Sequence, residues 1–474
     1  MQPCFLAVDI GASSGRHIVG TVQDGKITLQ EVYRFENGVR RENGRLCWNI
    51  DALAAEVVNG LKAAHDAGYT PATIGIDTWA VDFVLLDAEG QRIGDAVAYR
   101  DERTEGVREA LERDYGLTFA EHYARTGIQY QKFNTVYQLM ALKKEHPEQL
   151  AAAKTFLMVP DYLNYLLCGV AANEYTNAST TALVGADSQD WDDAMIAMLG
   201  LPRDIFQSIK TAGTVLGHLT PEMQAKVGFD AEVILPATHD TGSAFLAVPA
   251  RDEFAAYLSS GTWSLLGVEN AAAITSADSC VANFTNEGGY EYRYRYLKNI
   301  MGLWMIQSVR RELGEQNGTR PSFPELIAAA KEAADFASCV DPNDSRFLAP
   351  TSMIAEVKAA CAVTHQPMPQ TTGEVMQCIY NSLTQDYRRA IETLQALTGK
   401  TYTSLNIVGG GSQDGYLNQL TANATGLPVF AGPTEGTALG NLMVQFIHAG
   451  VFADLAEARA AIKRSFEIQE YNPQ

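Results

Sequence analysis

Residues 4–22, CFLAVDIGASSGRHIVGTV, decide how the rest of the chain is interpreted. The apolar run Cys4–Gly11 predicts a buried strand, and the small, hydroxylated residues after it predict a sharp turn into a second strand. Asp24 and Gly25 then predict a two-residue hairpin that leads to a third strand. The chain therefore opens with three antiparallel strands.

Helices and further strands follow this opening. Leu53, Val57, Leu61 and Ala64 recur at four- and three-residue steps, which predicts a helix that ends at Gly68. The runs TIGIDTW and VDFVLLDAEGQRIG predict a buried strand and a hairpin. Residues 103–217 are expected to be mainly helical, and within them NTVYQLMALKKEHPEQL is predicted to be a helix that begins at a cap, Asn134. Strands of mixed direction combined with helices predict an α/β domain with a mixed sheet.

The opening pattern recurs in the second half of the chain. Residues 255–269, AAYLSSGTWSLLGVE, again give a short apolar strand, a turn of small hydroxylated residues around glycine, and a second strand. The chain has 474 residues, and a single core rarely grows beyond about 250–300 residues. We therefore predict two domains with related cores, residues 1–247 and 248–474.

Composition narrows the partners and the location. The formal net charge of −20 repels nucleic acid and anionic lipid. The N-terminal stretch lacks a signal-peptide pattern, and no apolar run approaches the ~20 residues that span a bilayer. We expect a cytoplasmic protein with no nucleic-acid or membrane partner. Its state, monomer or homo-oligomer, stays open.

The cysteines do not form a recognisable framework. There are seven, with no CxxC pair, so the sequence predicts neither a disulfide scaffold nor a zinc site. Whether Cys361 and Cys378 pair with each other is left open.

Asp9 lies within the first predicted strand. A buried carboxylate is costly unless a metal ion, a cation or several donors compensate it. The turn after it, Gly11–Gly15, can converge backbone N–H groups on an anion, and Arg16 adds a charged fork suited to phosphate. The alternative is a polar hairpin with an Asp–Arg ion pair.

Two more loops contain small, hydroxylated or glycine residues of the kind that bind phosphate. The second hairpin offers Ser259, Ser260, Gly261 and Thr262, so the two turns could grip opposite ends of a triphosphate. In IVGGGSQ, residues 407–413, three glycines let a backbone lie close to a flat ligand or a phosphate. The alternative for this loop is a tight strand-to-helix turn.

Asp240 stands in LPATHDTGSAFLA, residues 235–247, between an apolar run and small residues. Asp and Thr are favoured helix N-caps, so a structural role is one explanation. The other is a carboxylate that orients an alcohol and accepts its proton, with small neighbours leaving room for a substrate.

Together, these loops resemble the nucleotide cleft shared by actin, heat-shock chaperone ATPases and sugar kinases. ATHDTGSA, YLSSGTWSLLG and IVGGGSQDGYLNQLTANATG resemble the FGGY family of carbohydrate kinases over nearly the whole chain. The resemblance implies an α/β fold in which two domains with related actin-like (ribonuclease H-like) mixed-sheet cores flank a nucleotide cleft. Residues 1–247 would carry the sugar site, the base and the first phosphate loop, and residues 248–474 the second phosphate loop and the adenosine site.

A further set of motifs resembles the rhamnulokinase branch of that family: VDIGASSGR, IGIDTWAVDFVLLD, AYRDERT, TGIQYQKFNT, NEYTNASTT, FTNEGG, LKNIMGLW and DPNDSRF. This implies ATP-dependent phosphorylation of a ketose at its primary hydroxyl, L-rhamnulose to L-rhamnulose 1-phosphate. Ala80 departs from the pattern, which has glycine there. The alternatives are a kinase for another ketose, such as L-fuculose or L-xylulose, and a non-catalytic nucleotide-gated sugar-binding protein.

The same resemblance implies roles for individual residues. Asp240 would be the catalytic base, and Asp9 would hold Mg²⁺, usually through water. ATP would contact Ala12, Ser13, Ser14, Gly15, Arg16, Thr262, Gln307 and Gly410. The sugar would contact Ala80, His239, Asp240, Thr241 and Asn299.

Overall fold

The computed structural model describes residues 3–474, and the chain divides into two compact units. Unit 1 contains Met1–Ala247, Glu269–Tyr296 and Gly436–Ser465, and unit 2 contains Val248–Val268, Leu297–Glu435 and Phe466–Gln474. The first break falls after Ala247, and two later segments return to unit 1. Neither unit is therefore continuous in sequence.

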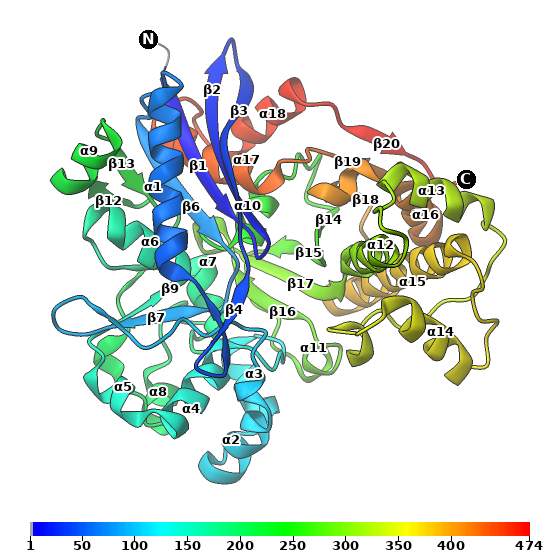
Figure 1. The fold of residues 1–474 in the computed structure, drawn as a ribbon, viewed down its shortest axis with the longest axis horizontal. Helices are drawn as coiled ribbons and strands as arrows, with labels where there is room; N and C mark the ends of the chain where they lie inside the picture. Colours follow the sequence, from blue (N-terminus) through cyan, green and yellow to red (C-terminus); the bar gives the residue numbers. More distant parts are fainter. Residues whose placement is uncertain (1–2) are drawn as a thin grey trace. The chain divides into compact units, whose positions relative to one another are not determined.

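Unit 1 is built on a six-stranded mixed sheet in the order β12-β13-β6-β1-β2-β3 (Figure 1). The first three strands, β1 (Cys4–Ile10), β2 (Ser14–Gln23) and β3 (Lys26–Glu36), pair antiparallel, as the sequence predicts. On its other side β1 pairs parallel with β6 (Thr73–Thr78), which pairs parallel with β13 (Glu232–Ile234).

Two helices cover opposite faces of this sheet. Leu6 and Val8 of β1 pack in one core with Leu53 and Val57 of α1 (Ile50–Asp66). Phe5 points the other way, and its ring lies 5.2 Å from that of Phe446 in α17 (Gly436–His448). Alternation along a strand explains why neighbouring residues serve different cores. The sheet is therefore buried on both faces, as an α/β unit requires.

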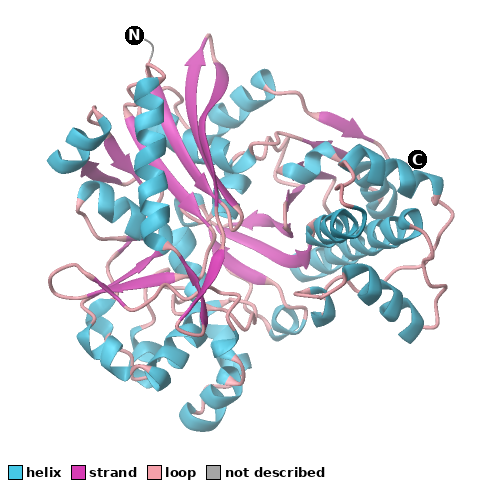
Figure 2. Cartoon of the chain, in the orientation of Figure 1, coloured by secondary structure: helices cyan, strands magenta, loops and turns pink. Residues whose placement is uncertain are grey.

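Unit 1 contains further strands, of which β12 is the edge strand of this sheet, and further helices (Figure 2). Its other strands are β4 (Val39–Glu42), β5 (Arg45–Trp48), β7 (Phe83–Leu86), β8 (Arg92–Ile93), β9 (Thr155–Met158), β10 (Asn173–Glu174), β11 (Ile209–Lys210), β12 (Val215–His218) and β16 (Thr285–Gly288). Its other helices are α2 (Val107–Tyr115), α3 (Phe119–Thr126), α4 (Thr135–Glu145), α5 (Pro147–Ala152), α6 (Val159–Cys168), α7 (Tyr175–Ala178), α8 (Asp193–Met198), α9 (Pro221–Val227), α10 (Asp240–Leu246), α11 (Ala277–Val281) and α18 (Leu455–Ser465).

The mainly helical middle is confirmed, with one correction at Asn134–Leu150. The sequence suggests a helix that starts from an Asn134 cap, but Asn134 makes no side-chain cap hydrogen bond and instead accepts from the Gln131 backbone. The helix also stops at His146, whose φ and ψ are −138° and 61°. A residue before proline is pushed out of the helical region, so Pro147 splits the stretch into α4 and α5.

Unit 2 is built on strands of a seven-stranded sheet in the order β16-β17-β15-β14-β18-β19-β20, of which β16 and the ends of β15 and β17 are counted with unit 1. The strands are β14 (Ala255–Ser260), β15 (Trp263–Asn270), β17 (Tyr294–Met301), β18 (Ser404–Val408), β19 (Val429–Ala431) and β20 (Gln469–Tyr471). The helices are α12 (Trp304–Asn317), α13 (Phe323–Glu332), α14 (Met353–Val363), α15 (Thr372–Thr398) and α16 (Gly415–Thr425).

The two sheets share a layout. In unit 2, β14 pairs antiparallel with β15 and parallel with β18, and β18 pairs parallel with β19. In unit 1, β1 stands in the same relation to β2, β6 and β13. The predicted pair of related mixed-sheet cores is confirmed.

Among residues 3–474, no helix is both long and apolar enough to span a membrane.

Cys361 and Cys378 are buried free thiols on α14 and α15, with their Sγ atoms 3.7 Å apart.

Candidate active site

Asp9 is held near the end of β1 by its neighbours on both sides. It is 6% exposed, as predicted for a carboxylate within the strand. Its Oδ2 accepts hydrogen bonds from Nε and Nη2 of Arg16, at 3.2 and 3.0 Å, across the β1–β2 pair. Both contacts use Oδ2, which leaves Oδ1 for another partner. The ion pair compensates the buried charge while one oxygen stays available.

The turn after β1 is shorter than the sequence suggests. It covers Gly11–Ser13, because Ser14, Gly15 and Arg16 already belong to β2. The Gly11 N–H donates to the Ser14 carbonyl at 2.9 Å and so is not free for an anion. Gly15 is required by packing, since a Cβ there would lie 2.1 Å from the Phe35 ring. Ser13 is exposed, and Ala12 and Ser14 are partly exposed.

A second carboxyl, which the sequence interpretation did not assign to the site, stands beside Asp9. Asp77 is its register partner on the parallel strand β6 and is fully buried. Its Oδ2 accepts from Nδ2 of Asn441 at 2.7 Å, whereas the buried Oδ1 has no hydrogen-bond partner among the described residues. Burial, with the nearby Asp9 charge, raises the pKa of Asp77 well above its usual value. Asp77, with its raised pKa, therefore lies next to the Asp9–Arg16 ion pair.

Asp240 is the first residue of α10, and His239 occupies the N-cap position. Its Oδ1 accepts from the Thr241 backbone at 2.6 Å and from the Thr241 hydroxyl at 3.1 Å. These contacts hold the carboxylate to its own neighbour, and the side chain remains 31% exposed. The acid therefore has an accessible face that a purely structural cap would not need.

Burial raises the pKa of Asp240, and the nearby Asp9 charge adds to the rise. A carboxyl with a raised pKa is a better proton acceptor once it is ionised. The environment of Asp240 therefore suits a general base.

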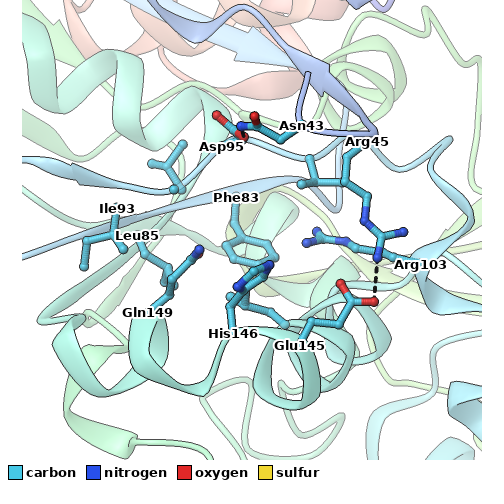
Figure 3. A pocket seen from close by; sticks show the side chains of 14 residues that line it. Asn43, Arg45, Phe83, Leu85, Ile93, Asp95, Arg103, Glu145, His146 and Gln149 are labelled. Carbon is cyan, nitrogen blue, oxygen red and sulfur yellow. Dashed lines mark hydrogen bonds and ion pairs between the residues drawn. The ribbon is translucent and has the colours of Figure 1, made fainter. Parts of the chain in front are cut away.

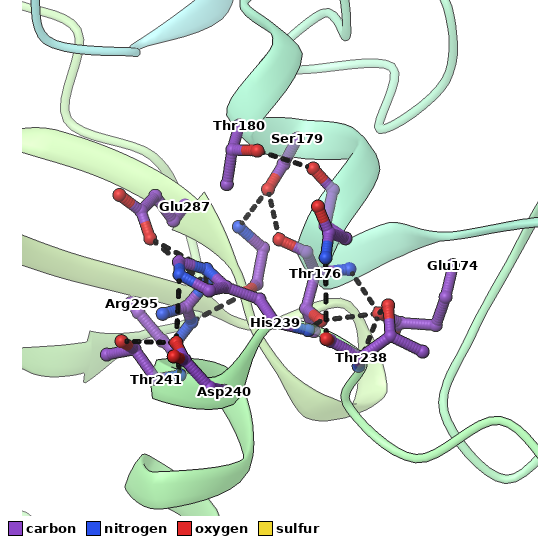
Figure 4. Close-up of polar contacts among 12 residues, drawn as sticks. Glu174, Thr176, Ser179, Thr180, Thr238, His239, Asp240, Thr241, Glu287 and Arg295 are labelled. Atoms are coloured by element: carbon purple, nitrogen blue, oxygen red, sulfur yellow. Dashed lines mark hydrogen bonds and ion pairs between the residues drawn. The ribbon is translucent and has the colours of Figure 1, made fainter. Parts of the chain in front are cut away.

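His239 joins Asp240 to a buried charged cluster (Figure 4). Its Nε2 lies 3.4 Å from Oδ1 of Asp240. Its Nδ1 lies 3.0 Å from Nη2 of Arg295 and 3.3 Å from Oε2 of Glu287. Arg295 is 1% exposed, and its Nη2 is 3.1 Å from Glu287 Oε2. Burial alone would raise the pKa of Glu287, but the charge of the Arg295 guanidinium opposes this, and the pKa lies below its usual value.

The segment that carries His239 is fastened by Glu174, at the end of β10. Oε2 of Glu174 accepts from the backbone N–H and the hydroxyl of Thr238, both at 3.0 Å, and from the backbone and hydroxyl of Thr176. The Thr176 hydroxyl lies 3.2 Å from the His239 backbone nitrogen, which donates to it (Figure 4). This network fixes the backbone just before Asp240.

Ala80 lies in a strained turn between β6 and β7. The next residue, Val81, has φ of 68°, which is a costly conformation for a β-branched residue. Its carbonyl accepts from the Thr135 hydroxyl at 2.7 Å and from Nε2 of Gln138 at 3.2 Å, and these contacts hold the turn. Strain of this kind persists where the surroundings fix the backbone, often at binding sites.

Asp82 organises the wall beside this turn and was not singled out from the sequence. Its carboxylate accepts from Nε1 of Trp48 at 2.6 Å, Nε1 of Trp79 at 3.0 Å, the Tyr99 backbone at 3.1 Å and Nε2 of Gln138 at 3.0 Å. The two indoles lie 4.0 Å apart. Trp79 is 6% exposed and belongs to the buried core of unit 1.

In unit 2, both Thr262 and Gln307 are associated with the start of helix α12. Thr262 is in the β14–β15 turn, and its carbonyl accepts from the backbones of Gly302 and Trp304, both at 3.2 Å. Gln307 lies in the first turn of α12, which starts at Trp304. Asn299 lies on β17, two residues before the end of that strand.

The three glycines after β18 do different jobs. A Cβ at Gly409 would lie 2.8 Å from the Ser260 carbonyl, and one at Gly411 would lie 1.9 Å from the Ser260 hydroxyl. These two glycines therefore let the loop pack against the β14–β15 hairpin. A Cβ at Gly410 would meet nothing within 4 Å, so this position has open space beside it.

The predicted site residues thus fall into two groups. In unit 1 lie Asp9, Ala12, Ser13, Ser14, Gly15, Arg16, Ala80, His239, Asp240 and Thr241, and in unit 2 lie Thr262, Asn299, Gln307 and Gly410.

The residues around Asp9 suit a Mg²⁺ ion that keeps most of its water ligands, rather than one whose ligands all come from the protein. Within residues 3–474, no group of three or more His, Cys, Asp or Glu side chains is arranged to hold a metal. Mg²⁺ commonly keeps several waters and binds one or two carboxylates together with phosphate. A single carboxylate oxygen left over by Arg16 is consistent with that chemistry.

Unit 1 also contains a cavity of about 740 Å³ that none of the predicted site residues lines (Figure 3). Arg45 and Glu145 line this cavity, and Arg45 forms ion pairs with Asp101 at 3.2 Å and with Glu145 at 2.6 Å. Arg103 also lines the cavity, and its Nη2 donates to Oε1 of Gln138 at 2.7 Å. Because Gln138 also contacts Val81 and Asp82, the cavity wall is connected to the Ala80 turn.

Comparisons with known proteins agree with this geometry. Residues 4–247 match the N-terminal domain of the FGGY family of carbohydrate kinases, and residues 256–449 match its C-terminal domain. A rhamnulokinase of Oceanobacillus iheyensis is 49% identical over 99% of this chain and 98% of its own. A rhamnulokinase of Halalkalibacterium halodurans is 50% identical over 98% of both chains.

The fold is also similar to that of solved sugar kinases. The ligand-bound xylulose kinase from Lactobacillus acidophilus superposes with a TM-score of 0.82 at 15% identity, over 100% of this chain and 94% of that one. At this identity the likeness concerns the fold. Two matching domain profiles and relatives of about half identity over the full length lead to one conclusion: the chain belongs to the FGGY family of carbohydrate kinases.

Proposed function

We propose that this chain transfers the terminal phosphoryl group of ATP to the primary hydroxyl of L-rhamnulose, giving L-rhamnulose 1-phosphate and ADP. The observation that carries the proposal is the partly exposed Asp240 carboxylate, with a raised pKa and His239 beside it. The rhamnulokinases at 49% and 50% identity over nearly the full chain support the choice of sugar. Kinases for L-fuculose or L-xylulose, and a binding protein without turnover, are less well supported.

Asp240 acts as the general base. Phosphoryl transfer needs positioning and charge neutralisation more than covalent help. The sugar hydroxyl is barely acidic, so a carboxylate within hydrogen-bond reach orients it and accepts its proton as the bond to phosphorus forms. The two hydrogen bonds from Thr241 to Oδ1 of Asp240 fix the carboxylate and leave Oδ2 for the hydroxyl.

The sugar contacts surround this base. His239 and Thr241 bind neighbouring hydroxyls, Asn299 binds another, and the backbone at Ala80 forms part of the wall. The strained Val81 and the Asp82 network hold that wall in place. The methyl group of Ala80, where the family pattern has glycine, makes the pocket slightly narrower at this point.

We assign the proposed ATP contacts within each unit separately. In this proposal, residues 1–247 supply the first phosphate loop, with Ala12, Ser13, Ser14, Gly15 and Arg16, together with the sugar site and the base. Residues 248–474 supply the second phosphate contact, Thr262, and the adenosine side, with Gln307 and Gly410. Mg²⁺, which Asp9 would hold through water, neutralises phosphate charge when it is bound. Because the reaction consumes ATP, we place it in the cytoplasm.

A coupled ADP-release assay tests the proposal. The purified chain is given ATP and Mg²⁺ with L-rhamnulose, L-fuculose, L-xylulose or no sugar. The expected result is the highest kcat/KM with L-rhamnulose and little ADP release without sugar. A higher kcat/KM with another ketose would assign a different substrate, and ADP release indifferent to every sugar would overturn the kinase assignment.

A further inference from the structure

Both ring nitrogens of His239 have protein partners, and the partners differ in kind. Nδ1 faces the guanidinium of Arg295 at 3.0 Å, and Nε2 faces the Asp240 carboxylate at 3.4 Å. The imidazole is 7% exposed. A buried histidine between fixed groups takes the tautomer that those groups impose.

The partner of Nδ1 decides the tautomer. A guanidinium nitrogen only donates hydrogen bonds, so the Arg295 contact requires a lone pair on Nδ1. Oε2 of Glu287 is also near, at 3.3 Å, but it forms no aligned hydrogen bond with any described residue. The proton of the neutral ring is therefore on Nε2, the nitrogen that faces Asp240.

We propose that Arg295 and Glu287 are positioning residues that hold His239 as the neutral Nε2–H tautomer, with its N–H directed to the reacting site. The inference rests on the proposed function for the roles of His239 and Asp240. In this arrangement Arg295 supplies the donor to Nδ1, and Glu287, 3.1 Å away, balances its charge.

The arrangement protects the base. An imidazolium 3.4 Å from Asp240 would stabilise the carboxylate and make it a weaker proton acceptor. A neutral ring can donate one hydrogen bond to Asp240 or to a sugar oxygen without adding a full positive charge. The charged groups that face the ring are Asp240, Glu287 and Arg295, with Glu174 and Asp9 acting from further away on Arg295 and Asp240 respectively.

The Glu287 carboxylate makes the opposite arrangement chemically conceivable. If Nδ1 donated its proton to Glu287, the pair would resemble a carboxylate–histidine dyad and would favour an imidazolium. Arg295 prevents this because its Nη2 donates to the Nδ1 lone pair. The Nη2–Nδ1 distance, 3.0 Å, is shorter than the 3.3 Å between Glu287 Oε2 and Nδ1. Removing Arg295 while keeping Glu287 should therefore switch the ring to the charged form.

Nitrogen NMR of the full-length chain, labelled with ¹⁵N-histidine, tests this directly. The chain has eight histidines, and His239→Gln identifies the relevant signals. The expected spectrum shows a protonated Nε2 and a bare Nδ1 for His239. A ring protonated on Nδ1, or on both nitrogens, would overturn the proposal. This measurement needs no substrate, so it stands or falls independently of the kinase assignment.

Three variants extend the test to turnover. Arg295→Met should give an imidazolium signal and lower kcat by about tenfold or more, with the KM for ATP within about twofold, because the base is weakened. Arg295→Lys keeps a group that donates hydrogen bonds to Nδ1 and cannot accept one, so it should preserve the tautomer and most of kcat. The double variant Arg295→Met/Glu287→Met removes both charges and should return the ring to its neutral form.

The outcomes are decisive even where a single variant folds poorly. If Arg295→Met unfolds, the wild-type spectrum and the charge-neutral double variant still report the tautomer. If Arg295→Met folds and keeps both the neutral Nε2–H signal and the kcat of the wild type, Arg295 has no positioning role and the proposal is wrong.

Discussion

The β1–β2 and β14–β15 hairpins share a backbone layout but carry different chemistry. Asp9 lies two residues before the turn glycine of the first hairpin, and Ser259 has the same place in the second. Across the antiparallel pair Asp9 faces Arg16, whereas Ser259 faces Leu265. Across the parallel pair Asp9 faces Asp77, whereas Ser259 faces Val408.

The difference shows how a repeated scaffold can divide one reaction. A turn of small hydroxylated residues can bind phosphate in either copy, because its backbone N–H groups do not depend on charged neighbours. Buried carboxylates need cations and donors, and only the first copy supplies them, through Arg16 and Asn441. In the proposed function, acid–base and metal chemistry would therefore belong to unit 1, and the second hairpin would contribute phosphate binding.

The sharpest way to test this division is Asp240→Asn. The amide keeps the shape of the side chain but cannot accept the sugar proton, so kcat should fall by about 10²–10⁴. Binding of ATP and of sugar, measured by titration calorimetry, should change little.

Thr262→Ser, in the second hairpin, is the matched control because it keeps a hydroxyl and touches no carboxylate. Its kcat should stay close to that of the wild type. If Asp240→Asn retained turnover near the wild-type level, the proton would go elsewhere and the assignment of the base would fail.

A direct exchange of equivalent positions gives the next largest effect. Asp9→Asn removes the carboxylate charge expected to hold Mg²⁺ through water and breaks the Asp9–Arg16 ion pair, so kcat at fixed Mg²⁺ should fall by about 10²-fold. Ser259→Ala, at the corresponding place, should lower kcat by no more than a few-fold. Raising Mg²⁺ should partly restore Asp9→Asn only. Equal losses in the two variants would remove the distinction between the hairpins.

The smallest predicted effect concerns phosphate binding. Arg16→Ala should raise the KM for ATP about tenfold, because a charged fork is lost, and should change the KM for the sugar much less. Arg113→Ala, which removes an exposed arginine of α2, serves as the control. A larger change in the KM for the sugar than in the KM for ATP would contradict the assignment of Arg16 to ATP binding.

Local sequence patterns predicted much of this fold. Alternation, glycine punctuation and the Asp24–Gly25 turn are signals within a few residues, and the three opening strands and the second hairpin follow from them. The break at His146 was missed although Pro147 was visible, because the helical pattern continues on both sides of it.

The supporting residues of the site could not be predicted in the same way. Glu287 and Arg295 reach His239 from segments about fifty residues away, and no local pattern marks such a contact. Asp77 and Asp82 stand in visible apolar runs, so an acid in a predicted strand was the available signal for both. Of the three glycines after β18, only the structure distinguishes the two that pack against Ser260 from Gly410.

The most direct test of the central claim is the pH dependence of kcat/KM for L-rhamnulose, in the wild type and in Asp240→Asn. Burial raises the pKa of Asp240, so the carboxylate is ionised above that pKa and becomes protonated as the pH falls through it. The wild type should lose about tenfold per pH unit below this pKa, and the residual activity of Asp240→Asn should lack this acidic limb. An unchanged acidic limb in the variant would show that another group is the base and would contradict the account.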